Sequence, residues 1–424
     1  MKKAFYLIVA IIMVACSKQK LSEQVPSKFN KQEIRHTIRS YDEALKIAEN
    51  AINMLESSKS STRSKEKCRT IDFTQNKVIM RDAKTRGDSI TSDSLIYVFN
   101  FENNEGFALV SASKNTEGLL AVTEQGHCDP DVPSGIDGFD MFVNMAKDYV
   151  LYGKMSPRSF EEIKDSIIDI ISYTEIGPYI PVNWGQNCAE GEYCRNGKAG
   201  CTNVAMAQIM AYYCHPDTIH LSYSGGSVLY LNWTNIRNHG TTHFANQCVD
   251  NTTHSSISHL LRELGNRNRS YYYLASETYD GQARTVTDTL HVRPTFQGLG
   301  FTVGTFSSYN IVNTRNTLDN QTPLLINGYT SDGVGHTWVI DGYMIENCIA
   351  YEMIKYGDGD WQFTGYSYPT TRYLVHFNWG WYGANNGYFL EGIFDSGNAV
   401  HYDNTNYYQY NLGYYVETLS VGLN

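Results

Sequence analysis

The sequence is poor in the signals that mark several common classes of protein. Its net charge of −10 comes without a basic stripe, which argues against nucleic acid as a partner, because nucleic-acid-binding proteins gather Lys and Arg on one face. The 9 cysteines form no CxxC pair, and no HExxH motif occurs. What remains is an ordinary globular composition, 42% hydrophobic and 18% charged, over 424 residues. That length suffices for two or three domains.

Long apolar runs are also missing. The stretch 4–15 follows Met1-Lys2-Lys3 and is too short to span a bilayer, so we interpret it as a secretory signal. It ends at Cys16, and a small residue followed by cysteine at this point resembles a bacterial lipobox. We therefore expect Cys16 to be the lipidated first residue, anchoring the chain to the cell envelope. Ser17 favours the outer membrane by resemblance to other lipoproteins. An ordinary signal peptide with an incidental cysteine is the alternative.

One cysteine stands at the start of a strong helical pattern. Gly200 breaks regular structure, and the apolar residues after Cys201 recur with helical spacing until Pro216, which predicts a helix from about 202 to 214. A thiol at a helix N-terminus faces unpaired N–H groups and the positive end of the helix dipole, and both favour the thiolate. Cys201 is therefore a candidate nucleophile. A buried structural cysteine is the commoner alternative.

A thiolate needs a base, and two of the 12 histidines lie in suggestive surroundings. His336 begins a run of apolar and aromatic residues after two glycines, and His376 lies within a second such run. Cys201 and His336 stand 135 positions apart, similar to the roughly 130–150 residues that separate the two in papain-type peptidases. The spacing favours His336 as the base.

These residues carry a resemblance to the streptopain family of secreted bacterial cysteine peptidases. Segment 199–210 resembles the nucleophile helix of that family, 335–343 its histidine strand and 376–388 its third block. Between them, 256–265 resembles the helix before a substrate-lining loop, and 184–186 is similar to the segment with the oxyanion-hole glutamine. The similar segments follow one another in the family's order from about residue 35 to 395.

The resemblance implies an α+β, papain-like domain with a helical half and an antiparallel, strand-rich half. It also assigns roles: Asn378 would orient the imidazole of His336, Trp379 would shield that hydrogen bond from water, and Gln186 would help to bind the oxyanion. His376 is then left as a satisfied strand histidine. Two departures stand out, because the Pro-Tyr-Asn usual after the glutamine is missing and an insert rich in Tyr and Gly fills 346–371. We expect that insert to be a longer loop that could reshape the cleft.

The region before the nucleophile reads as a small α+β domain. Periodicity predicts a helix over 41–55, a hairpin from 96–101 and 107–111, and a helix over 139–151. This block resembles the inhibitory pro-domain of streptopain-like zymogens. An ordinary accessory domain is the alternative.

The expected division is a signal peptide at 1–15, lipidated Cys16 with a tether at 16–34, a pro-domain at 35–153, a junction at 154–178 and a catalytic domain at 179–424. Basic cleavage points in the junction are Lys154, Arg158 and Lys164.

The sequence thus predicts a lipid-anchored cysteine endopeptidase made as a zymogen, which acts on proteins or peptides and needs no cofactor or metal. Its own pro-domain would be its intramolecular inhibitor. Three alternatives stay open: a papain-fold acyl transferase, an inactive surface binding lipoprotein, and a metal enzyme. The last would use His239, His243, Cys214 and His215. With Cys16 and Cys201 assigned, a full disulfide framework is not expected, although Cys188 and Cys194 could close a small loop.

Overall fold

The computed structural model describes residues 38–59, 69–80, 94–155, 163–187, 191–240, 250–330, 335–355, 362–394 and 414–423. The predicted signal peptide, Cys16 and the tether lie outside these ranges. None of the helices within them is both long enough and apolar enough to cross a bilayer.

The first described helix, α2 (Tyr41–Lys59), begins with a capping box. The Ser40 N–H donates to Glu43 Oε2 at 2.7 Å, and the Glu43 N–H donates to Ser40 Oγ at 3.2 Å, so two backbone donors are satisfied reciprocally. The helix buries residues at intervals of three or four positions: Ala44, Ala48, Ala51 and Leu55. One face of α2 therefore packs on the sheet that follows, as the periodicity predicted.

The predicted hairpin is confirmed as β2 (Ser94–Asn100) and β3 (Phe107–Ser111), with Asn100 opposite Phe107. Its turn contains Asn103 and Asn104 with φ of 61° and 56°, a left-handed conformation that Asn tolerates better than most residues. The remaining elements of the N-terminal part are β1 (Lys77–Met80), β4 (Leu119–Thr123) and α3 (Asp137–Met155).

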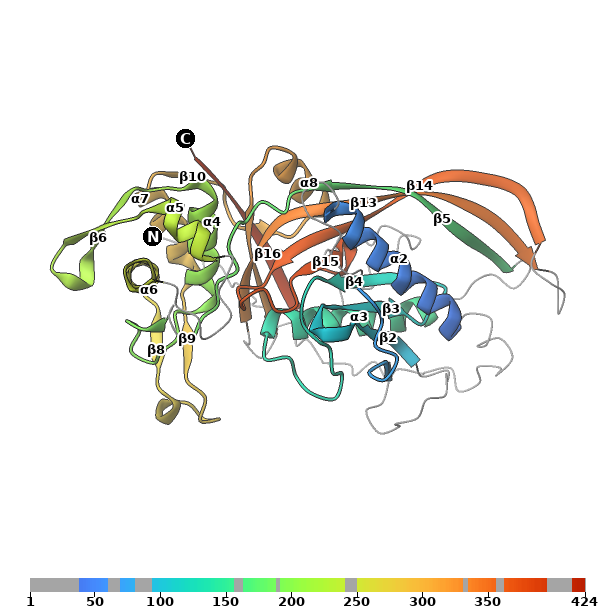
Figure 1. The fold of residues 1–424 in the computed structure, drawn as a ribbon, viewed down its shortest axis with the longest axis horizontal. Coiled ribbons are helices and arrows are strands. Elements are labelled where there is room, and N and C mark those ends of the chain that lie inside the picture. The colour runs from blue at the N-terminus through green and yellow to red at the C-terminus, as the bar shows by residue number, and fades with distance from the viewer. Residues whose placement is uncertain are drawn as a thin grey trace, which may run out of the picture.

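The C-terminal part is divided into a helical half and a strand-rich half, which confirms the expected α+β class. The helical half contains α4 (Cys201–Tyr213), β6 (Thr218–Leu221), β7 (Ser227–Tyr230), α5 (Trp233–Gly240), α6 (Asn251–Arg267), β8 (Tyr271–Tyr273), β9 (Arg284–Val286) and α7 (Val292–Gly298). The other half contains β10 (Phe301–Val303), β11 (Ser307–Ser308), α8 (Ile311–Asp319), β12 (Leu324–Thr330), β13 (Gly335–Lys355), β14 (Gln362–Asn378), β15 (Gly387–Leu390) and β16 (Tyr414–Leu423). Figure 1 shows α4 to α7 grouped at one end of the molecule, with the sheet beside them.

A single antiparallel sheet joins the N-terminal part to the strand-rich half. Within the described residues its main path runs β1-β2-β3-β4-β15-β14-β13-β12-β16-β10. The two parts meet where β4 pairs with β15, with Val122 opposite Tyr388. The hydrophobic cores are shared as well, because Phe139 and Phe142 of α3 pack in one cluster with Phe377 and Phe389. The strands before and after the expected junction at 154–178 therefore belong to the same sheet.

The insert at 346–371 is not the long loop that we expected. Its described residues continue β13 and β14, which pair with each other from Val339 opposite Asn378 to Ile354 opposite Gln362. A third strand, β5 (Ile163–Ile176), pairs along the other edge of β13. The three strands extend together away from the body of the molecule (Figure 1). The expectation was wrong because the two arms of the insert pair with each other, and β5, which comes from elsewhere in the chain, pairs with the other edge of β13.

Strand β5 occupies most of the junction that we expected at 154–178. Lys154 lies in the last turn of α3 and Lys164 lies within β5, whereas Arg158 lies outside the described residues. Since backbone paired in a sheet is a poor substrate for proteases, Lys164 is a weaker cleavage candidate than its position in the sequence indicated.

Candidate active site

Cys201 is the first residue of α4, as the sequence predicted. The cap residue Gly200 has φ +92°, and a Cβ added there would lie 2.8 Å from Thr285 Cγ2. Both facts require glycine at this position, because an L side chain is strained at this φ and would clash. The helix behind Cys201 is almost entirely buried. A rigid helix thus holds the thiol at its positive end while the residue itself stays partly exposed.

His336 lies near the start of β13 and is 4% exposed. Its Nε2–H donates to the backbone carbonyl of Trp379 at 2.9 Å. The side chain also hydrogen-bonds Cys201, and because Nε2 is already engaged, that bond is left to Nδ1. Beside it, the hydroxyls of Thr202 and Thr337 are 3.0 Å apart. They tie the start of α4 to β13, so the structure brings the predicted nucleophile and base together.

The electrostatics of this pair favour a thiolate and an imidazolium. Burial alone would raise the pKa of Cys201, but the charge of His336, its hydrogen bond and the backbone of Thr337 together lower it. Burial alone would likewise lower the pKa of His336, but the charge of Cys201, its hydrogen bond and the Trp379 carbonyl raise it. Both shifts favour transfer of the thiol proton to His336, which would leave the sulfur as the nucleophile.

Asn378 does not make the hydrogen bond that the sequence analysis assigned to it. Its Oδ1 accepts from Gln208 Nε2 and from the Gly380 N–H, both at 3.1 Å. Its Nδ2 donates to the Val182 carbonyl at 3.1 Å. The imidazole of His336 is oriented instead by a backbone carbonyl one residue further on. The sequence does not show that Gln208 of α4 and the Val182 carbonyl compete for the Asn378 amide. This is why the predicted bond to His336 is not made.

Trp379 lies beside His336, fully buried, with ring centroids 6.4 Å apart. Its Nε1–H donates to the Asn385 carbonyl and its backbone N–H to Asn386 Oδ1, both at 2.9 Å. The indole is therefore fixed against the imidazole, and the carbonyl of the same residue accepts from it. The sequence assigned Trp379 only the shielding of a hydrogen bond. In the structure, Trp379 itself accepts the hydrogen bond from His336.

Gln186 is placed next to the nucleophile segment through its backbone. Its carbonyl accepts from the Ala199 N–H at 2.8 Å, two residues before Cys201. Cys188 lies outside the described residues, and Cys194 is a free, buried thiol. The suggested disulfide between the two therefore stays a prediction.

Three polar residues that the sequence analysis did not single out support the start of α4. Asn203 Nδ2 donates to the Ala199 carbonyl at 2.8 Å, and its Oδ1 accepts from Asn268 Nδ2 at 2.9 Å. Gln208 bonds to Asn378 from the next turn. Two polar residues, Asn203 and Gln208, within the otherwise apolar helix α4 are the sequence signal that could have pointed to this network.

The residues proposed for the metal alternative have other partners where they are described. His215 Nε2 donates to the Leu299 carbonyl at 2.8 Å, and Cys214 Sγ accepts from Arg237 at 3.3 Å. His243 lies outside the described residues. Within the described part of the chain, no group of three or more His, Cys, Asp and Glu side chains is arranged to hold a metal ion.

The model of the Peptidase C10 family matches residues 177–389, half of the chain, with Cys201, His336 and Asn378 inside it. This chain belongs to the Peptidase C10 family. The resemblance to streptopain is thereby confirmed. The Spi protease inhibitor model matches residues 31–150, so the N-terminal part of this C10 chain is called the pro-domain below.

Two individual proteins are also similar to this C10 chain. The thiol protease/hemagglutinin PrtT of Porphyromonas gingivalis is 22% identical over 334 residues, which cover 72% of this chain and 35% of PrtT. The chain thus spans about a third of the length of that relative. The structure of a fragment of Prevotella intermedia prointerpain A aligns at 16% identity with a TM-score of 0.47, over 81% of this chain and 98% of that fragment.

The pro-domain of this C10 chain reaches the active site through the first turns of α3. A Cβ added at Gly138 would lie 2.7 Å from both His336 Cδ2 and Trp379 Cζ3, so the helix backbone is packed directly on these rings. One turn later, Met141 packs on Gly328 of β12. A Cβ added at Gly328 would lie 2.7 Å from Met141 Sδ and 3.0 Å from the Trp338 ring. The helix therefore covers one side of the His336 imidazole.

Asp137 adds a charge to this contact. The residue is exposed to solvent. Partial removal of water from its carboxyl nevertheless raises the pKa of Asp137, and the charge of His336 offsets part of that rise. The same carboxylate helps to raise the pKa of His336 and opposes ionisation of Cys201. A pro-domain acid thus faces the catalytic pair in the uncut chain.

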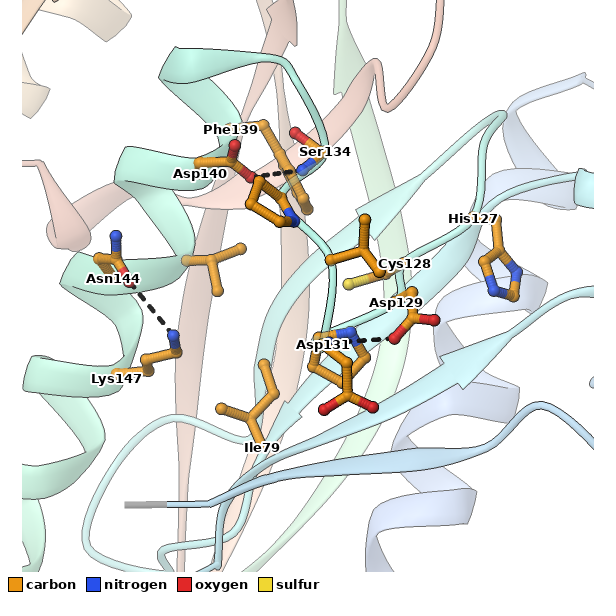
Figure 2. A pocket seen from close by; sticks show the side chains of 14 residues that line it. Ile79, His127, Cys128, Asp129, Asp131, Ser134, Phe139, Asp140, Asn144 and Lys147 are labelled. Atoms are coloured by element: carbon orange, nitrogen blue, oxygen red, sulfur yellow. Dashed lines mark hydrogen bonds between the residues drawn. The ribbon is translucent and has the colours of Figure 1, made fainter. Parts of the chain in front are cut away.

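A cavity of about 460 Å³ lies elsewhere, within the pro-domain (Figure 2). Its lining includes Ile79 of β1, Cys128, Asp131, and Asp140 and Lys147 of α3. The Ser134 N–H donates to Asp140 Oδ1 at 3.1 Å, and this bond ties the loop before α3 to the helix (Figure 2). Neither Cys201 nor His336 lines it, so this cavity is separate from the active site.

Proposed function

We propose that this chain is a cysteine endopeptidase made as a zymogen, with Cys201 as nucleophile and His336 as acid and base. The hydrogen-bonded pair at the start of α4 carries the proposal. The thiolate attacks the scissile carbonyl carbon, and His336 gives its proton to the leaving amine, so that a thioester forms. Water then attacks the thioester, His336 takes the water's proton, and the acid product leaves.

The oxyanion of each tetrahedral intermediate needs donors. We assign the Cys201 backbone N–H and the Gln186 side chain to this role, each worth about 3–4 kcal/mol in comparable sites. Support for Gln186 comes from its backbone contact with Ala199. Trp379 acts as a positioning residue, because its carbonyl holds the ring nitrogen of His336 that faces away from the thiol.

The pro-domain inhibits by covering the catalytic pair. Gly138 and Met141 of α3 pack against the His336 side of the site, and Asp137 faces the pair. An extended peptide cannot pass over His336 while the helix backbone lies on its ring. Removal of residues 35–153 would therefore open the site to peptide and protein substrates.

We also propose that the chain is anchored to the bacterial cell envelope through a lipid on Cys16. The support is the apolar run before it and the resemblance to a lipobox. Mass spectrometry of the protein from its native membrane should find a diacylglyceryl group on Cys16. A mature N-terminus at any other residue would refute the anchor.

Substitution Cys201→Ala tests the function. It removes the nucleophile but little volume, so casein hydrolysis by the trimmed enzyme should disappear while the unfolding temperature stays unchanged. Ordinary turnover by the variant would exclude the mechanism. Iodoacetamide should label Cys201 in the native trimmed enzyme far faster than the buried Cys194, whereas a merely binding lipoprotein would show no such difference. Release of new N-termini, rather than exchange of amides, would exclude the acyl transferase.

A further inference from the structure

The hairpin of β8 and β9 presents a row of tyrosines to solvent. Side chains alternate along its strands, so Tyr272 packs into the core of the helical half while its neighbours point outward. We define the tyrosine face as Tyr271, Tyr273, Tyr279, Arg284 and Val286. Tyr271 and Tyr279 are 68% and 93% exposed. Several large side chains exposed together on one short element indicate an interaction surface, whereas single exposed ones need no explanation.

The side chains of the tyrosine face contact one another. The rings of Tyr271 and Tyr273 stack, with centroids 6.1 Å apart. Arg284 lies opposite Tyr273 in the hairpin. Its guanidinium pairs with Asp280 and lies over the Tyr279 ring, 5.5 Å from the ring centre. The rings are thus ordered before any ligand arrives, which lowers the entropy that binding costs. Tyrosine suits such a surface, because its ring offers a large, rigid contact area and its hydroxyl stays in water.

The hairpin is fixed to the segment that carries the nucleophile. Asn196 Nδ2 donates to a backbone carbonyl of each strand, at 3.1 Å for β8 and 2.9 Å for β9. Thr285 Oγ1 donates at 2.7 Å to the carbonyl of Lys198, which lies three residues before Cys201. The side chain of Thr285 also packs against Gly200, the cap of α4. The tyrosine face therefore keeps a fixed position relative to the thiol.

The tyrosine face also lies within electrostatic reach of the catalytic pair. In the uncut chain Asp137 stands beside the His336 ring, because the next residue, Gly138, packs on that ring. Partial removal of water raises the pKa of Asp137, and the charges of His336 and Arg284 both oppose that rise. One carboxyl is thus close enough to feel both the catalytic histidine and the tyrosine face. Figure 1 shows the hairpin projecting from the helical half, away from α4 and α6.

We propose that the tyrosine face is a substrate-docking surface, which binds an extended segment of a protein substrate at a distance from its scissile bond. This role rests on the proposed function, in which Cys201 attacks that bond. The substrate of an endopeptidase continues on both sides of the scissile bond, so one arm of it follows the hairpin that is fixed beside the thiol. The pairing of Arg284 with Asp280 leaves the face with little net charge. The exposed rings therefore select apolar segments of unfolded chains, and peptides too short to reach the hairpin gain nothing from them.

The first experiment compares casein with a short peptide as substrates of the enzyme, which is folded as the full chain and then activated by limited proteolysis. The double variant Tyr271→Ser/Tyr273→Ser should lower kcat/KM for casein about tenfold, since aromatic residues carry much of the energy of such contacts. The loss should lie mainly in KM, because docking stabilises bound substrate and transition state equally. A fluorogenic tetrapeptide that spans only the positions next to the scissile bond should be cleaved within about twofold of the parent rate.

The matched control is Tyr366→Ser/Tyr368→Ser. These tyrosines are 70% and 51% exposed, but they lie on β14 where it extends away from the body of the molecule (Figure 1). The control should change the hydrolysis of neither substrate. Tyr279→Ser alters the turn and neither strand, so it keeps the test valid if the double variant misfolds. It should lower kcat/KM for casein about threefold and leave the tetrapeptide unchanged.

No loss for casein in the Tyr271/Tyr273 variant, or a loss equal to that of the control, would overturn the proposal. A loss for the tetrapeptide as large as that for casein would also overturn it, because the rings would then support the catalytic pair and not a remote segment. A parent enzyme that cleaves neither substrate would overturn the proposed function.

The second experiment measures binding without turnover. The tyrosine face is exposed in the uncut chain, so the full chain with Cys201→Ala should bind fluorescently labelled casein although α3 covers one side of His336. Adding the two tyrosine-face substitutions should weaken this binding about tenfold, and adding the two control substitutions should not. Equal binding by both would overturn the proposal. Sedimentation velocity on the same proteins tests the other occupant: a parent dimer that the tyrosine-face variant dissociates would assign the face to a second copy of the chain and overturn substrate docking.

Discussion

His336 and His376 lie on adjacent strands, and the comparison between their surroundings separates catalysis from structural support. They are 4% and 3% exposed, and the pKa of each is raised although burial acts against it. The partner of His336 is the thiol of Cys201, whereas the partners of His376 are carboxylates, Asp341 and Glu124. A thiol that gives its proton to histidine becomes a nucleophile, while a carboxylate that pairs with histidine only holds it. The partner, rather than the burial or the raised pKa, therefore identifies the catalytic histidine.

The sharpest test of this comparison removes each histidine in turn. His336→Gln should lower kcat/KM of the trimmed enzyme by about 10³-fold with little change in stability, because general acid–base catalysis contributes about 10²–10⁴-fold. His376→Gln should lower the free energy of unfolding by about 3–5 kcal/mol, since it leaves Asp341 buried without its cation. Peptide hydrolysis by the folded His376 variant should stay within a few fold of the parent. Comparable losses of activity in both variants would break the comparison.

The pH dependence of the trimmed enzyme sharpens the same point. The active form needs the thiolate and the imidazolium together. Because the pKa of Cys201 is lowered and that of His336 is raised, we expect this form to prevail at pH values between the two. The rate should rise with pH through the first pKa and fall, about tenfold per unit, as His336 loses its proton above the second. A kcat/KM that climbs steadily into alkali would show a free thiol instead of the pair.

A smaller effect is expected where the pro-domain touches His336. In Gly138→Ala the new methyl group would meet His336 and Trp379, both buried and held by hydrogen bonds. Overpacking of this kind costs about 1–3 kcal/mol, so the isolated pro-domain should inhibit the trimmed enzyme about tenfold less well. Asn144→Ala, on the exposed side of α3, is the control. Equal inhibition by both variants would show that α3 does not lie on the catalytic ring during inhibition.

The smallest effect on catalysis should come from Asn378. Since its amide holds Val182, Gln208 and Gly380 rather than His336, Asn378→Ala should destabilise the fold by about 1–3 kcal/mol through unpaired buried groups. The loss in kcat should be only a few fold, and the alkaline limb of the pH profile should not move. A loss as large as that of His336→Gln would restore the direct role that the sequence assigned.

Much of the local structure was predictable from short patterns. The predicted helix 202–214 is α4, and the predicted hairpin is β2 with β3. Both predictions worked because the spacing of apolar residues and the residues that permit turns act over a few positions. The prediction of a loop at the insert failed because its two arms pair as a long hairpin, and that hairpin is supported along β13 by β5, a strand that the sequence analysis treated as part of a junction.

By itself, the sequence determined the family, the position of Cys201 at a helix N-terminus and the pairing of a thiol with a histidine far along the chain. These follow from motifs and from local spacing, which are read without knowing any contact. Only the tertiary structure decided that the Trp379 carbonyl, not the Asn378 amide, accepts from His336, and that His376 faces Glu124 of the pro-domain. Neighbouring polar groups compete for the same donor, and the winner depends on the distances and angles that packing imposes between residues remote in sequence.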